Sequence, residues 1–199
     1  LNDDMILREV AFFMQAGSHS SANALTHCFH EITQWCLTHP EDRARLATDD
    51  AFLQRCVHES LRLHPASTVA WRTASEPFTL TDGTDIPAGG TVIIDLMSAN
   101  LEPELFGEDA ASFNPHREIA HRIPPFGLTF GIGIHTCFGR DIAGGLGQTK
   151  DAAQAPHIGT LSNLLKSLLA NHARPDPEAP PIADTATERP NWGSYPLLV

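Results

Sequence analysis

The chain opens with a helical repeat of apolar residues that is long for a protein of 199 residues. Apolar or small residues recur near the 3.6-residue period at Ile6, Val10, Phe13, Gly17, Leu25, Phe29, Ile32 and Trp35. Asn2 or Asp3 can cap the first turn, and Pro40 lies beyond the end. The pattern predicts one helix of about 30 residues, roughly 45 Å long, and a helix of this length usually crosses the whole core of a small protein.

Five small or polar residues interrupt the middle of this repeat, Gly17-Ser18-His19-Ser20-Ser21. Glycine costs about 1 kcal/mol relative to alanine inside a helix, and serine hydroxyls compete for backbone groups. We therefore expect the helix to be locally opened here.

Two shorter helices follow. Pro40 can begin one of them, and Asp49 or Asp50 can cap another over residues 51–63, which His64-Pro65 would end. Over residues 67–97 the pattern changes to alternation with turn signals, which predicts a small antiparallel sheet.

Proline and glycine recur so often over residues 102–133 that only short helical turns fit. After Cys137 a short helix should end at Gly144-Gly145, and an insert then occupies residues 145–159. A last helix and a tail occupy residues 160–199, where the Pro-rich and acidic stretch 174–190 is predicted to be a surface extension. The whole chain is interpreted as one mainly α region with a small antiparallel β-sheet.

Composition limits the classes of partner. Asp plus Glu number 24 and Lys plus Arg 13, so the formal charge is −11. Such a chain repels phosphate backbones and anionic lipid headgroups. No stretch approaches the roughly 20 apolar residues of a membrane span, and no secretory signal is recognisable. We expect a soluble, cytoplasmic protein with neither nucleic acid nor membrane as partner, and we interpret the start at Leu1 as lying inside a larger chain.

The four cysteines form no CxxC pair, which argues against a zinc knuckle or a disulfide framework and fits a reducing compartment. Cys28, Cys36 and Cys56 are interpreted as small core residues. Cys137 differs because it lies in the string Phe130-Gly131-Ile132-Gly133-Ile134-His135-Thr136-Cys137-Phe138-Gly139. A pattern FGxGxHxCxG arises by chance in a chain of this length on the order of once in a million.

The residue types in this string suit an iron-bound thiolate. A thiolate ligand must be deprotonated, and a metal at bonding distance achieves that. Gly131, Gly133 and Gly139 allow backbone N–H groups to turn toward the sulfur, and Phe130 can shield it from water. Cys137 would then be a single anionic iron ligand, a property that favours O–O cleavage.

The string resembles the cysteine-ligand loop of the cytochrome P450 family. Further matches occur in the family's order: Ala16-Gly17 on the long helix, Glu59-Ser60-Leu61-Arg62 as ExxR, Arg72 on the first strand and Phe113-Asn114-Pro115-His116-Arg117 as FxPxR. The resemblance covers only the C-terminal, haem-binding half of the P450 fold. It implies a long oxygen-site helix over 1–38, the ExxR helix over 51–63, the sheet over 67–97 and the ligand loop with its helix over 126–144.

The resemblance also implies a cofactor and its ligands. Haem b (iron protoporphyrin IX) would be held by Cys137 as axial iron ligand, with His135 and Arg72 as partners of its propionates. Ala16 and Gly17 would form the opposite wall of the haem slot. Glu59, Arg62 and Arg117 would be structural, because the family's buried ExxR pair locks to this arginine.

The sequence departs from the family in three places. Where the family commonly has Gly, any residue, an acid and Thr, this chain has Gly17, Ser18, His19 and Ser20. Ser20 and His19 are therefore the catalytic candidates for proton delivery, with a surface position on the helix as the alternative for His19. The insert 145–159 interrupts the family's last long helix, on the side where an electron donor would dock. The segments that roof the substrate pocket are missing.

The implied function is a monooxygenase that inserts one oxygen atom of O2 into a small organic substrate, with electrons from a ferredoxin- or flavodoxin-type donor. Two alternatives stay open. The chain could be a truncated or split half that binds haem without catalysis and needs a missing N-terminal half, or it could be a peroxide-driven haem-thiolate oxidase.

Overall fold

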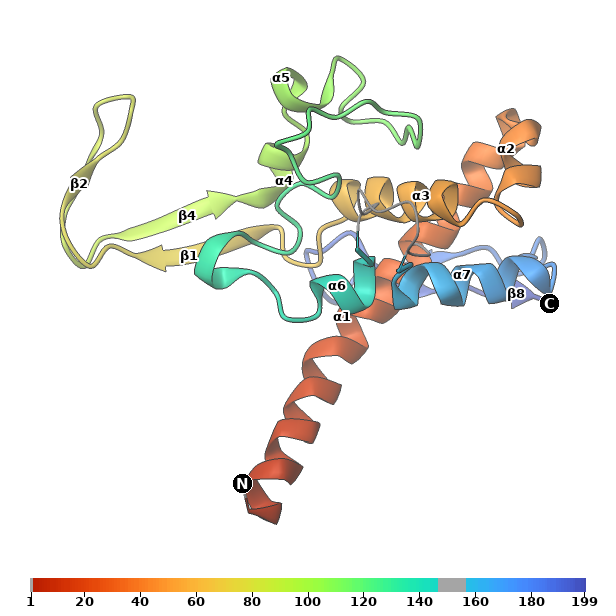
Figure 1. Cartoon of the computed structure of the whole chain (residues 1–199), viewed down its shortest axis with the longest axis horizontal. Helices are drawn as coiled ribbons and strands as arrows, with labels where there is room; N and C mark the ends of the chain where they lie inside the picture. Colours follow the sequence, from red (N-terminus) through yellow and green to blue (C-terminus); the bar gives the residue numbers. More distant parts are fainter. Residues whose placement is uncertain (1, 147–156) are drawn as a thin grey trace.

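The computed structural model describes residues 2–146 and 157–199, and one long helix dominates it (Figure 1). Helix α1 spans Asp3–Thr38, and the Asn2 side chain caps it by accepting the Met5 N–H at 2.9 Å. Within these two stretches of the chain, no helix is long and apolar enough to cross a membrane.

The expected opening in the middle of α1 is wrong, because the helix is unbroken from end to end. The Ser20 hydroxyl donates to the Ala16 carbonyl oxygen one turn earlier, at 3.0 Å, and the Ser18 hydroxyl reaches the Gln15 carbonyl at 3.5 Å. These bonds add to the helical backbone bonds and do not replace them. The serines are therefore accommodated within regular helix.

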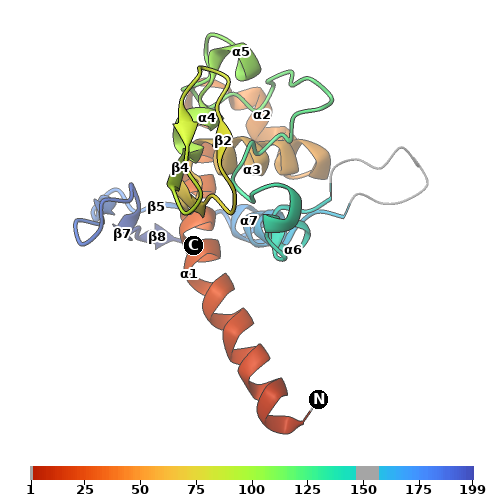
Figure 2. The same cartoon turned by 90° about the vertical axis from the view of Figure 1, so that its left-hand side faces the viewer.

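The expectation that α1 crosses the core along its whole length is also wrong. Its first half projects away from the rest of the molecule (Figures 1 and 2), and apolar side chains such as Ile6, Phe12 and Phe13 are exposed there. Burial begins at Ala24 and continues to Ile32. Periodicity marks the apolar face of a helix, but it does not show where along the helix another element covers that face.

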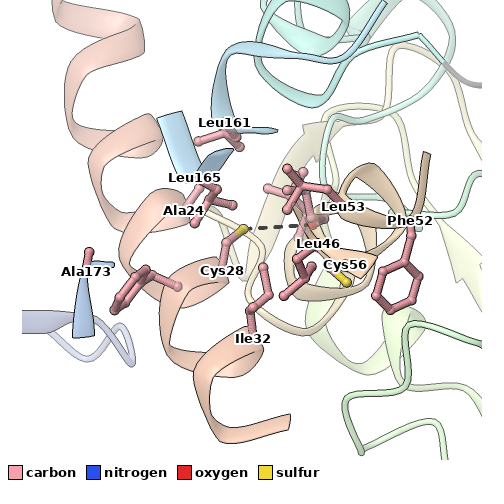
Figure 3. Packing of buried hydrophobic residues seen from close by; sticks show 13 residues of the cluster. Ala24, Cys28, Ile32, Leu46, Phe52, Leu53, Cys56, Leu161, Leu165 and Ala173 are labelled. Atoms are coloured by element: carbon pink, nitrogen blue, oxygen red, sulfur yellow. Dashed lines mark hydrogen bonds between the residues drawn. The ribbon is translucent and has the colours of Figure 1, made fainter. Parts of the chain in front are cut away.

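The core lies where the second half of α1 meets α3, Asp50–Leu63, and α7, Thr160–Ala170 (Figure 3). Cys28 and Cys56 are buried in it, as predicted, whereas Cys36 is only half-buried at its edge. Burial raises the pKa of the Cys28 thiol to about 12. These two cysteines thus act as small core residues.

Two capping predictions are confirmed. Helix α2, Pro40–Arg45, begins at the predicted proline. The Asp49 side chain caps α3 by accepting the Phe52 N–H at 2.9 Å. Both helices begin where local backbone chemistry favours a start.

The predicted antiparallel strands form two separate ladders. Strand β1, Val69–Thr73, pairs with β4, Thr91–Asp95, so that Arg72 lies opposite Val92. Strand β2, Phe78–Thr79, pairs with β3, Asp85–Ile86, across a turn that contains Gly83 at φ +90°.

Only short helices follow, as predicted: α4 (Leu96–Asn100), α5 (Pro103–Phe106), the 3-10 helix η1 (Gly133–His135) and α6 (Arg140–Gly144). Helix α6 ends at the predicted Gly144-Gly145 pair. Most of the predicted insert, residues 147–156, lies outside the described part of the chain.

The tail is more than a surface extension, because it forms strands that pair with one another. Strand β5, Arg174–Pro175, pairs with β8, Leu197–Leu198, and β6, Ile182–Ala183, pairs with β7, Trp192–Ser194. Tyr195 then reaches α1, where its hydroxyl lies 3.0 Å from Nδ1 of His30.

Next to this tail, α1 carries a buried imidazole. The His27 ring is stacked on the His64 ring with centroids 4.2 Å apart, and His64 Nε2 lies 2.7 Å from the Glu31 carboxylate. Burial, followed by the proximity of His64, lowers the pKa of His27 to about 4. The folded protein therefore holds His27 in its neutral form.

This pKa shift predicts acid sensitivity. Unfolded His27 takes up a proton near pH 6.5, whereas the folded protein resists protonation until about pH 4. Stability should therefore fall as the pH drops from 6.5 to 4, by up to about 3 kcal/mol from this residue. Urea unfolding of wild type and His27→Gln across this range measures it, with the exposed His121→Gln as control. A wild-type pH profile no steeper than that of His27→Gln would contradict the prediction.

Candidate active site

One cavity, of about 360 Å³, brings together segments that lie far apart in the sequence. It is bounded by the middle of α1, the C-terminal end of α3, β1 and the loop that precedes α6. Six of the predicted site residues line it: Ser20, Arg72, Phe130, Gly131, His135 and Cys137. The cavity thus contains the cysteine, both candidate propionate partners and one of the two catalytic candidates.

The backbone of the cysteine loop closes on itself. The Cys137 N–H donates to the Phe130 carbonyl oxygen at 2.7 Å. Gly131 is at φ +67°, and a Cβ on it would lie 2.7 Å from the His135 carbonyl oxygen. Since only glycine combines that φ with that closeness, Gly131 is required by the loop geometry.

Gly139 is a neighbour of the sulfur, since a Cβ built on it would lie 3.7 Å from Cys137 Sγ. Gly133 is at φ +61° at the start of η1, and a Cβ on it would have no atom within 4 Å. The Cys137 side chain is exposed, which leaves its sulfur accessible from the cavity that it lines.

The α1 candidates fall on different sides of the helix. Ser20 is half-buried at the cavity wall, whereas His19 is exposed and contacts the Asn23 side-chain amide at 3.2 Å. Asn23 itself lines the cavity. Ala16 and Gly17, expected to form the wall of the slot, are exposed and lie outside the lining, because α1 contacts the rest of the described chain only from the following turn onward.

Arg72 and His135 contribute N–H groups to the cavity wall. The Arg72 side chain is half-buried and donates through Nη1 to the Trp71 carbonyl oxygen at 2.8 Å. No carboxylate of residues 2–146 or 157–199 forms an ion pair with Arg72 or with His135. Their donors can therefore serve an anionic group of a ligand.

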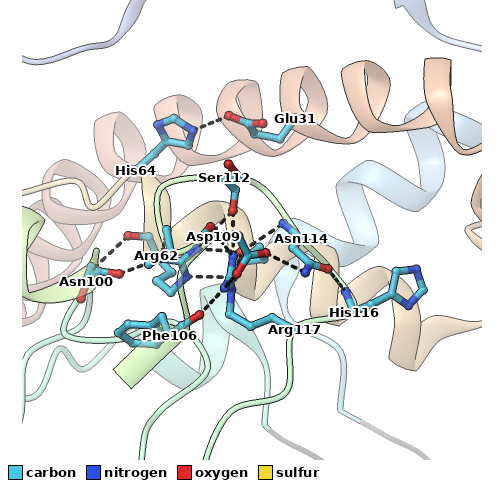
Figure 4. Close-up of polar contacts among 12 residues, drawn as sticks. Glu31, Arg62, His64, Asn100, Phe106, Asp109, Ser112, Asn114, His116 and Arg117 are labelled. Atoms are coloured by element: carbon cyan, nitrogen blue, oxygen red, sulfur yellow. Dashed lines mark hydrogen bonds and ion pairs between the residues drawn. The ribbon is translucent and has the colours of Figure 1, made fainter. Parts of the chain in front are cut away.

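The C-terminal half of α3 carries a buried charge network (Figure 4). Arg62 and Glu59 pair through two parallel bonds of 2.7 and 2.8 Å, and Arg117 Nε donates to the same carboxylate at 3.0 Å. These three side chains are at most 4% exposed. Figure 4 also shows Arg117 contacting Asp109 and the backbone of Phe106.

Arg62 extends this network to the backbone. Its Nη1 donates to the carbonyl oxygens of Asn100 and Ala110, each at 2.7 Å. The guanidinium therefore ties the end of α3 to the segment that follows the β1–β4 ladder. It is fully buried, yet each of its nitrogens has a partner.

Comparison with known proteins identifies the chain. The sequence profile of the family described as "Cytochrome P450" matches residues 1–144. The chain belongs to the cytochrome P450 family.

Among curated P450s, the monooxygenase PikC of Streptomyces venezuelae is 33% identical over 144 residues, which cover 72% of this chain and 32% of PikC. Cyclooctat-9-en-7-ol 5-monooxygenase of Streptomyces melanosporofaciens is 32% identical over 72% of this chain and 34% of its own length. The chain thus spans about a third of the length of these relatives. The corticosterone complex of CYP109E1 from Bacillus megaterium matches with a TM-score of 0.72 at 21% identity, over 99% of this chain and 47% of that one. This last match establishes the partial P450 fold.

The cavity fits the haem that P450s bind. Its walls combine the sulfur of Cys137 with the N–H donors of Arg72 and His135 and with apolar side chains such as Leu61 and Leu161. The described residues contain no group of three or more His, Cys, Asp and Glu side chains that could hold a metal ion. A haem would need only one protein ligand, because its porphyrin supplies the other donors.

Sequence reasoning missed several residues that position the site. Asn100 is fully buried, accepts the Leu128 N–H at 2.7 Å and donates to the Arg62 carbonyl oxygen at 3.0 Å. A Cβ on Gly127 would overlap the Asn100 side chain. No local signal marks an asparagine of this kind, because its partners come from two other segments.

The charge network yields a stability prediction. Removing one partner of a buried ion pair typically costs about 3–5 kcal/mol, against about 1 kcal/mol at most on the surface. Glu59→Ala should therefore lower the free energy of unfolding by about 3–5 kcal/mol, since it leaves Arg62 and Arg117 without their carboxylate.

The chain offers a matched control, the exposed pair of Asp4 and Arg8 on α1. Asp4→Ala should change the denaturant midpoint little. Equal losses in the two variants would show that Glu59 does not act as a buried partner.

Proposed function

We propose that this chain carries the haem-binding half of a haem-thiolate monooxygenase that inserts one oxygen atom of O2 into a small organic substrate. The observation that supports this most is that Cys137, Arg72, His135 and Ser20 line one cavity although they come from separate segments. Curated relatives with about a third of their length in common are monooxygenases.

Cys137 is the proposed axial ligand of haem b. When bound, a haem with a thiolate ligand supplies oxygen activation, since the sulfur favours O–O cleavage. The Cys137 N–H bond to Phe130 fixes the backbone at the sulfur. Phe130 also lines the cavity, where its ring can exclude water from the thiolate.

Arg72 and His135 are the proposed partners of the two haem propionates. Both lie at the cavity wall and form no ion pair with another described residue. Charged or N–H donors at such a position offset the cost of burying two carboxylates.

Ser20 and His19 are the proposed proton route. The Ser20 hydroxyl lies at the cavity wall, where it can hold a water or a proton near the reacting oxygen. His19 lies on the exposed face and reaches the cavity only through Asn23, whose amide it contacts. We infer that His19 exchanges protons with solvent and that Asn23 links it to the cavity.

The proposed partners are O2, the organic substrate and an electron donor of the ferredoxin or flavodoxin type. Turnover with NAD(P)H and a donor, compared with turnover on peroxide alone, distinguishes the monooxygenase from a peroxide-driven oxidase.

Substitution of the cysteine tests the ligand assignment. Cys137→Ser should abolish the red-shifted ferrous carbonyl band after which the family is named, because a hydroxyl does not replace the thiolate. Absorption spectra of the reduced, CO-treated protein measure it, and Cys36→Ser is the matched control, expected to keep the band. A Cys137→Ser protein that retains the band would refute the assignment.

The proton route has its own prediction. Ser20→Ala should leave substrate binding intact and lower the product formed per NAD(P)H consumed, since general acid catalysis contributes roughly 10²–10⁴-fold. His19→Gln should flatten the pH dependence of this yield, because it removes the imidazole from the proposed proton route.

Product yield is measured between pH 5.5 and 8.5 on the holoenzyme, with exposed His121→Gln as control. An unchanged yield and pH profile in His19→Gln would assign His19 to the solvent-exposed surface alone.

A further inference from the structure

Helix α6, which directly follows the Cys137 loop, ends after five residues. Gly145 continues the chain at φ +78°, and the next described segment begins at His157. The last carbonyl oxygens of any helix lack partners from their own helix. At the end of α6, buried carbonyls such as that of Gly144 therefore need donors from elsewhere.

The backbone is tightly packed where the chain leaves α6 and returns to it. The Leu146 N–H donates to the His157 carbonyl oxygen at 3.0 Å. A Cβ on Gly145 would lie 2.5 Å from the Gly159 nitrogen, and a Cβ on Gly159 would overlap the Ala143 carbonyl. We call these residues, 145–146 and 157–159, the neck, and its two glycines are buried.

Helix α3 supplies the missing donors. Gln54 Nε2 donates to the carbonyl oxygens of Gly144 and Leu146, each at 3.1 Å, and His58 Nε2 donates to Gly144 at 2.7 Å. The two side chains lie one turn apart on the same face of α3. They are only 4% and 5% exposed.

His58 also contacts the other flank of the cysteine loop. Its ring meets Phe126 edge-on with centroids 5.4 Å apart, and Phe126 meets Phe130 in the same way at 5.0 Å. Phe130 in turn accepts the Cys137 N–H. A Cβ on Gly144 would lie 3.2 Å from the Phe130 ring, so the two flanks of the loop touch each other.

We propose that Gln54 and His58 are positioning residues for Cys137. Their side chains donate hydrogen bonds to the carbonyl oxygens at the end of α6, where the next turn of a longer helix would otherwise have supplied backbone N–H donors. By fixing the end of α6, they set the direction in which the Cys137 sulfur points. This inference rests on the proposed function, in which Cys137 binds the haem iron.

The test compares four variants of the holoprotein. His58→Phe keeps an aromatic ring against Phe126 but removes the donor, and Gln54→Met keeps the length but removes the donor. His58→Gln is the conservative variant that retains an N–H. Ser162→Ala, which removes a buried α7 hydroxyl that has no hydrogen-bond partner among the residues that the structure describes, is the control for general damage to the core.

Two readouts separate positioning from folding: haem affinity, and the fraction of the ferrous carbonyl complex that shows the thiolate band. His58→Phe and Gln54→Met should weaken haem affinity about 10- to 100-fold, the range for partners that orient a ligand, and should lower the thiolate fraction. His58→Gln should restore both, and Ser162→Ala should change neither. If His58→Phe does not fold, Gln54→Met and His58→Gln still decide the question.

Unchanged affinity and thiolate fraction in Gln54→Met and His58→Phe, with only a lower melting temperature, would overturn the proposal. Failure of the proposed function looks different. Wild type would then lack the thiolate band and resemble Cys137→Ser, which would remove the ground for positioning as well.

Discussion

The rest of the structure depends on one buried carboxylate, that of Glu59. It accepts hydrogen bonds from Arg62 on its own helix, from Arg117 and from the backbone N–H of Asn114. Burying a carboxylate and two guanidinium groups away from water costs free energy unless the opposite charges pair. The remaining N–H donors must also form hydrogen bonds with oxygen atoms. Here the remaining donors of both arginines end on backbone carbonyls or on Asp109. The segment after the β1–β4 ladder, which has only the short helices α4 and α5, is thereby held in place.

Helix α3 has three different contact surfaces around its axis. One carries the charge network, another packs Leu53 and Val57 into the core, and the third presents Gln54 and His58 to the end of α6. Almost every residue of α3 after Ala51 is buried as a result. Helix α3 thus gives the cavity a wall that is packed on several sides, while the Cys137 loop contributes mainly backbone turns and glycines.

The sequence predicted the parts of this structure that depend on local chemistry. Proline at the first turn of α2, the Asp49 cap of α3 and the Gly144-Gly145 end of α6 all act within a few residues, and each appears where it was predicted. The cysteine loop was recognisable because its glycines and Cys137 occur within ten consecutive residues.

Features that depend on distant partners were not predictable. Asn100, Gln54 and His58 acquire their roles from carbonyl and N–H groups of segments far along the chain. The exposed first half of α1 has the same apolar period as its buried second half, so pattern alone could not separate them. The serines of α1 were misjudged because their hydroxyls can bond the preceding turn without opening it.

The neck has a consequence for how this site tolerates change. Its two ends are joined by the Leu146 N–H bond and by the contact of Gly145 with Gly159, and both sides are anchored through Gln54. Whatever length of chain lies between the ends, the free energy of closing it grows only with the logarithm of that length. A change in the length of chain between the two ends therefore adds little to the free energy of closing the neck, and it leaves the bonds that Gln54 makes to the neck as they are.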